Sequence, residues 1–118
     1  MAKREQPRFI PPRLGMRDYA RVSLVPRWFA REAVTAFGLS PYDIAAFTVI
    51  ADNLDANGIS TTAMTLIADR GGMSEGGAAK AVGRLLAAGI IHELDPRSKG
   101  RIMRYGIAAE IPWTGDRR

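Results

Sequence analysis

The chain has 118 residues and a mass of 12.9 kDa, with 47% hydrophobic and 25% charged residues, a composition typical of one small folded domain. It has no cysteine and a single histidine, His92, which excludes disulfides and thiolate metal sites and disfavours histidine-based catalysis or metal binding. With 17 Lys+Arg against 12 Asp+Glu, the formal net charge of +5 favours an anionic partner.

The charge is divided unevenly along the chain. Residues 1–31 carry eight basic and two acidic side chains, a net charge of +6. Residues 32–91 carry three basic and six acidic side chains, a net −3, and residues 92–118 carry six and four, a net +2. Two basic ends therefore flank an acidic middle. A basic end can be a solubilising arm or a contact for a polyanion.

The sequence predicts neither secretion nor insertion into a membrane. The start, MAKREQPRF, is basic but is not followed by an apolar stretch. No apolar run reaches the roughly 18 residues that span a bilayer. We therefore expect a cytoplasmic protein with no membrane partner.

Residues 1–25 are expected to form a flexible basic arm, because arginine and proline dominate and few apolar side chains are available for burial. The folded domain is expected over 26–111. Its first helix is predicted over 26–37, with Gly38 ending it and Trp28 covering the edge of the core. The side chains expected to face the core are Phe29, Ala33, Ala36 and Phe37.

A second helix is predicted to follow over 40–54, with a clear starting signal. Ser40 is placed as N-cap, Pro41 at the first helical position and Asp43 three residues after the cap. The segment DANG at 55–58 is expected to end the helix. Its predicted core stripe is Ile44, Phe47, Ile50, Ala51 and Leu54.

Two short helices with a tight turn between them come next. After Ile59, a brief extended residue, Ser60, Thr61 or Thr62 is expected to cap a helix that runs to Arg70 and ends at Gly71 and Gly72. Ser74 is expected to cap a helix that reaches Ala88 and is closed by Gly89. The residues expected to be buried are Ala63, Met64, Ile67, Ala68, Ala78, Ala81, Val82, Leu85 and Leu86. Such a pair of helices forms a helix-turn-helix.

The segment IIHELDPRSKGRIMRYGIA, residues 90–108, predicts a β-hairpin with a basic tip. Ile90 and Ile91 lead into the first strand, and the turn contains Pro96, Ser98, Lys99 and Gly100. The second strand is expected to contain Ile102, Tyr105 and Ile107. Residues 112–118 are expected to be a C-terminal tail.

The order helix, helix, tight turn, helix and basic hairpin resembles a winged helix-turn-helix, a mainly α fold with a small β-hairpin. The residue spacing is similar as well: Ile67-Ala68, Gly72-Met73-Ser74, Ala78, Lys80, Val82, Arg84-Leu85 and Gly89-Ile90-Ile91 stand at offsets common in winged-helix families. The span 39–107 resembles the helix-turn-helix domains of phage and plasmid replication proteins. The segment DPRSKGR is similar to the wing of MarR-type repressors.

This resemblance implies binding to duplex DNA, with the recognition helix 74–88 in the major groove and the wing 95–104 on the backbone or minor groove. The residues implied as DNA contacts on the helix are Ser74, Gly76, Gly77, Lys80 and Arg84. Those on the wing are Arg97, Ser98, Lys99, Arg101 and Arg104, and those on the arm are Arg4, Arg8, Arg13 and Arg17.

The start of the recognition helix departs from the family pattern. Glu75, Gly76 and Gly77 occupy positions where such families read bases, and glycine offers no side chain for a hydrogen bond. Lys80 is therefore left to read bases on this helix, with Arg84 as a second candidate. We expect either that specificity comes from the arm and the wing or that this helix has another use. The two glycines allow either a close approach of the backbone to a partner or simple fraying of the helix.

Three functions follow as hypotheses. The first is a duplex-DNA-binding protein of plasmid or phage type, acting in replication, partition or transcriptional regulation, and as a homodimer if its DNA site is symmetric. The second is a protein–protein interaction module that uses the glycine face of the helix 74–88. The third, an enzyme, is not expected, because no set of residues suited to catalysis, a metal or a cofactor is found.

Overall fold

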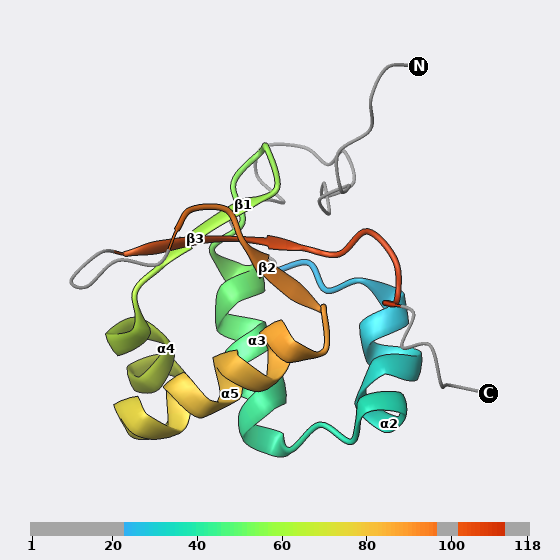
Figure 1. Cartoon of the computed structure of the whole chain (residues 1–118), viewed down its shortest axis with the longest axis horizontal. Helices are drawn as coiled ribbons and strands as arrows, with labels where there is room; N and C mark the ends of the chain where they lie inside the picture. The colour runs from blue at the N-terminus through green and yellow to red at the C-terminus, as the bar shows by residue number, and fades with distance from the viewer. Residues whose placement is uncertain (1–22, 97–101, 113–118) are drawn as a thin grey trace.

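The computed structural model describes residues 23–96 and 102–112 (Figure 1). Its elements in chain order are the π-helical turn η1 (Phe29–Ala33), α2 (Val34–Phe37), α3 (Pro41–Asp52), β1 (Ile59–Thr62), α4 (Met64–Gly71), α5 (Glu75–Ala87), β2 (Ile91–Glu93) and β3 (Met103–Ile107). The described part of the chain is thus a set of helices with a three-stranded antiparallel sheet.

A single α-helix is predicted over 26–37, but the structure has the π-helical turn η1 followed directly by the short α-helix α2. Phe29 and Ala33 are buried as predicted, but Ala36 is exposed and Val34 packs against the core in its place. A π-helical turn holds an extra residue, so it rotates the residues after it around the helix axis. Gly38 ends the segment in a left-handed conformation with φ 62°, as predicted.

The beginning of α3 confirms the predicted cap. The Ser40 hydroxyl accepts a hydrogen bond from the Asp43 backbone N–H at 3.2 Å, and the Asp43 carboxylate accepts one from the Ser40 N–H at 2.9 Å. The helix ends at Asp52 rather than at the predicted residue 54. Asn53 then leaves the helix, and its side-chain amide donates to the Thr62 hydroxyl at 3.1 Å.

The prediction that Ser60, Thr61 or Thr62 caps a helix is wrong. These residues form β1, which pairs antiparallel with β3, and the residue that precedes α4 is Ala63, which has no capping side chain. Ser60 and Thr62 are buried, and their hydroxyls lie 2.6 Å apart. A polar strand can be buried here because its hydroxyls bond to each other and its backbone bonds to β3.

The predicted hairpin is present and belongs to a larger sheet. The strand order is β1-β3-β2, with Ser60 opposite Tyr105 and Glu93 also opposite Tyr105 on the other side. The predicted β-hairpin is therefore confirmed, whereas the prediction missed the third strand. Ile102, expected in the second strand, precedes β3 and is 55% exposed.

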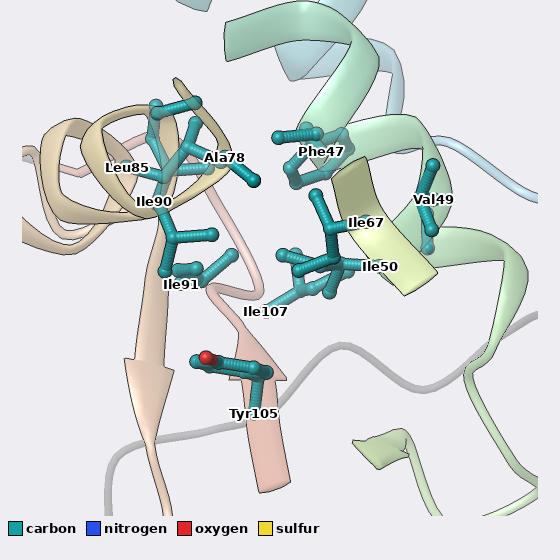
Figure 2. Close-up of a cluster of buried hydrophobic side chains, with 14 of the residues drawn as sticks. Phe47, Val49, Ile50, Ile67, Ala78, Leu85, Ile90, Ile91, Tyr105 and Ile107 are labelled. Carbon is teal, nitrogen blue, oxygen red and sulfur yellow. The ribbon is translucent and has the colours of Figure 1, made fainter. Parts of the chain in front are cut away.

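The core lies where α3, α4 and α5 meet under the sheet (Figure 1). Figure 2 shows side chains from α3, α4 and α5 converging on Ile90 and on residues of the sheet; the labelled ones include Phe47, Ile67, Leu85, Tyr105 and Ile107. Phe29 stacks on Phe47 with ring centroids 3.8 Å apart, which attaches η1 to α3. Trp28 packs against the edge of the same core, as predicted.

Candidate nucleic-acid interface

The turn between α4 and α5 is short, and its conformation is fixed by the residues that end α4 and begin α5. Gly72 ends α4 with φ 69°, a conformation that favours glycine, and Ser74 already caps α5 by accepting from the Gly77 N–H at 3.0 Å. Only Gly72, Met73 and Ser74 therefore separate the two helices. The partly buried Met73 packs against the core, so the turn fixes the start of α5 relative to α4.

α5 has one buried face and one nearly bare face. Ala78, Ala81, Val82 and Leu85 are buried as predicted, and Leu86 is partly buried. The exposed positions of the helix are Glu75, Gly76, Ala79, Lys80, Gly83, Arg84 and Ala87. The helix thus presents its backbone with little side-chain cover, apart from Glu75, Lys80 and Arg84.

The glycines of α5 differ in what their surroundings require. A Cβ added to Gly77 would lie 3.2 Å from the Ser74 hydroxyl, so Gly77 fits closely beside the cap. A Cβ on Gly76 would meet only that hydroxyl, at 4.0 Å, and one on Gly83 would meet nothing within 4 Å. The packing of the described residues therefore accounts for Gly77 but not for Gly76 or Gly83.

Lys80 is exposed on the bare face and makes no ion pair with any described residue.

Arg84 lies one helical turn further along α5 and, unlike Lys80, forms an ion pair. Its Nε donates to Asp43 Oδ1 at 2.8 Å, joining α5 to the beginning of α3. Half of the Arg84 side chain is exposed, whereas that of Asp43 is 1% exposed. Arg84 therefore has an acidic partner on α3, whereas Lys80 has none among the described residues.

The wing also contains a paired arginine. Arg104 on β3 binds Asp95 with two parallel hydrogen bonds, from Nε and Nη2, each 2.8 Å long. These bonds, and next the Coulomb attraction of the carboxylate, raise the pKa of the Arg104 guanidinium above its ordinary value. Arg104 is thus charged but already has an anionic partner, which the sequence pattern does not predict.

A third pair lies at the far end of α3. Arg70 and Asp52 approach to 3.6 Å, and both side chains are about half exposed. Ser23, inside the segment expected to be an arm, donates a hydrogen bond to Asp52. The described arginines on α4, α5 and β3 thus each form an ion pair with an aspartate.

Most of the other predicted contact residues lie outside the described ranges. They are Arg4, Arg8, Arg13 and Arg17 on the arm, and Arg97, Ser98, Lys99 and Arg101 at the wing tip. The structure thus brings Gly76, Gly77, Lys80 and Arg84 together on α5, with Ser74 as the N-cap of that helix, and places Arg104 on β3. Asp43 and Asp95 are two residues at this surface whose pairing the sequence pattern does not predict. For Asp43 the pattern predicts only a helix cap.

Comparison with known proteins adds no family. No protein-family model matches the chain, and no curated protein matches it significantly.

In residues 23–96 and 102–112, no three His, Cys, Asp or Glu side chains gather in a way that could hold a metal ion. Nor does any helix in those ranges combine the length and the apolar character needed to cross a membrane.

Proposed function

We propose that the chain is a winged helix-turn-helix protein that binds duplex DNA, with α5 as the recognition helix and the β2–β3 hairpin as the wing. The observation that carries this proposal is the outer face of α5, which combines a bare backbone around Gly76 and Gly83 with Lys80, a side chain that makes no ion pair with the described residues. A helix of this kind can lie deep in a major groove, because few side chains keep its backbone away from the bases.

The arrangement of the elements supports the same proposal. α4 and α5 are joined by a tight turn, and the order α3, β1, α4, α5, β2, β3 with a β1-β3-β2 sheet is compatible with a winged helix. The basic ends of the chain would then supply phosphate contacts on either side of α5. Replication, partition and transcriptional regulation are the roles that fit such a protein of plasmid or phage type.

A salt titration of binding to a fluorescein-labelled random duplex tests the proposal. If about six basic residues contact phosphates, log affinity falls with log salt concentration at a slope of about −5. Lys80→Ala should reduce the preference for a selected site over random DNA, while substitution of Arg97, Lys99 and Arg101 by Gln should weaken binding to all sequences alike. Absence of binding at low salt would contradict the proposal.

Selection of bound sequences from a random pool gives the target and its symmetry. A palindromic site would indicate a homodimer, since a symmetric site is bound by a symmetric pair of recognition helices. An asymmetric site would indicate a monomer on DNA.

The second candidate function is a protein–protein interaction module on the same scaffold. The space around Gly76 and Gly83 favours it as well, because a partner helix can approach a glycine face closely. This function predicts no salt-dependent binding to duplex DNA, so the titration separates the two candidates.

A further inference from the structure

Asp43 is a buried carboxylate whose two oxygens bind two different elements. Oδ2 accepts from the Ser40 backbone N–H at 2.9 Å, and Oδ1 accepts from Arg84 Nε at 2.8 Å. The side chain is 1% exposed. Removing a carboxylate from water is unfavourable unless its hydrogen bonds are made in the protein, and here each oxygen has one. The backbone N–H of the N-cap residue Ser40 therefore sets the direction of the carboxyl group, which in turn sets the direction of Arg84.

The guanidinium of Arg84 is held at one edge only. Its Nε–H is bound to Asp43, and its two Nη groups have no hydrogen-bond partner among the described residues. The guanidinium is planar, so fixing the Nε–H also fixes the direction of the remaining N–H donors. Half of the side chain is in contact with solvent, on the outer surface of α5. A ligand with two acceptor oxygens can therefore reach an edge that is already oriented.

We propose that Asp43 is a positioning residue that holds Arg84 ready to bind a phosphate of the DNA backbone through its Nη edge. This inference rests on the proposed function and assigns a different role to each basic residue of α5: Arg84 contacts phosphate and Lys80 contacts bases. A planar guanidinium fits two phosphate oxygens in parallel. Because Asp43 restricts the rotamers of Arg84 before binding, less conformational entropy is lost when the contact forms.

The direction in which Asp43→Asn changes the affinity for DNA distinguishes a positioning role from a simple effect of net charge. Removing a negative charge from a DNA-binding protein normally strengthens binding, because the net positive charge rises. Asp43→Asn leaves one acceptor oxygen for two donors, the Ser40 N–H and the Arg84 Nε–H, and makes the remaining hydrogen bond a neutral one. Arg84 is then held less firmly, so the substitution should weaken binding although it removes a negative charge. Asp52→Asn makes the same change beside Arg70, where both partners are about half exposed, and should leave binding unchanged or tighter.

The experiment is the salt titration with the full chain and the labelled random duplex. Asp43→Asn should weaken binding about tenfold, the effect of one charge-assisted hydrogen bond. It should also make the salt slope less steep by about 0.9, the value for one phosphate contact. Arg84→Ala should give the same loss, and the double variant should lose no more than Arg84→Ala alone.

Two further variants distinguish positioning from a structural role. Arg84→Lys keeps the positive charge and a partner for Asp43, but one ammonium group cannot present a second, planar edge, so it should bind more weakly than the unmodified chain. It should lose less than Arg84→Ala, because an ammonium group still attracts phosphate as a point charge. Ser40→Ala removes the capping hydroxyl while leaving the ion pair, so it should lower the stability to urea without changing the salt slope. Circular dichroism establishes that each variant is folded at the titration temperature. If Asp43→Asn does not fold, Arg84→Lys carries the test.

The inference is overturned if Asp43→Asn binds as tightly as the unmodified chain or more tightly, or if Arg84→Lys binds as well as arginine. Failure of the unmodified chain to bind duplex DNA overturns the proposed function itself and the inference with it. The two failures are therefore distinguishable.

Discussion

Two glycines, one just before α5 and one inside it, lack a side chain for different physical reasons. Gly72 has φ +69°, and nothing lies within 4 Å of the position of its missing Cβ, so the backbone conformation alone favours glycine. Gly83 is inside α5 and is also surrounded by open space, but its conformation suits any residue. The fold therefore explains Gly72, whereas Gly83 weakens a helix without benefit to its packing.

Replacing Gly83 by alanine should stabilise the protein and impair its binding. The higher helix propensity of alanine predicts a gain of about 1 kcal/mol in the free energy of unfolding, measured by urea titration with far-UV circular dichroism. If DNA approaches the bare face of α5, the added methyl group lies in the interface and lowers the affinity for duplex DNA. Gly72→Ala is the matched control. It makes the same chemical change but should destabilise by about 1 kcal/mol, because of its left-handed backbone.

A gain in stability with unchanged affinity for Gly83→Ala would contradict the close approach of DNA to this face. A loss of stability would mean that the added methyl group meets neighbouring atoms, contrary to the open space around the Cβ position of Gly83.

At the scale of elements, local signals predicted boundaries well and long-range contacts less well. Ser40, Ser74, Gly38 and Gly89 act within one or two turns, and each stands where the sequence placed it. The strand β1 was missed because serine and threonine resemble helix caps locally. Its partner β3 is more than 40 residues further along the chain, and pairing with it outweighs the local preference.

In the candidate site, too, the sequence predicts the local features but not the long-range contacts. The buried and exposed faces of α5 follow from its periodicity, so the exposure of Lys80 and Arg84 was predictable. The pairing of Arg84 with Asp43 was not, because the two residues are 41 positions apart and Asp43 already had a local explanation as a cap. Its pairing depends on how α3 packs against α5.

The wing should bind DNA more strongly when Asp95 is neutralised. Asp95→Asn removes the negative charge and one of the two acceptor oxygens that bind Arg104, so the guanidinium is held more weakly and becomes available to a phosphate. We expect a salt slope steeper by about 0.9 and a severalfold higher affinity at low salt, measured with the labelled random duplex. Glu110→Gln is the control, since it makes the same change in charge at an exposed position after β3. Equal effects of the two variants would mean that only net charge matters.

At the scale of the whole molecule, the net charge of +5 is not spread over the folded body. Residues 32–91 have a net charge of −3, and two of their three basic residues, Arg70 and Arg84, are paired with aspartates. Lys80 is the third, and it makes no such pair with the described residues. A polyanion that binds this protein must therefore obtain most of its contacts from the two ends of the chain.

Neutralising two arginines of the basic arm should therefore reduce binding more than neutralising two on the folded body. Arg13→Gln together with Arg17→Gln should make the salt slope less steep by about 1.8, twice the value for one phosphate, and should weaken binding to specific and random duplexes equally. Arg27→Gln with Arg31→Gln is the matched pair, because it removes the same charge from exposed positions around η1. If the second pair alters the slope as much as the first, long-range attraction by net charge dominates, and the arm makes no contact of its own with the backbone.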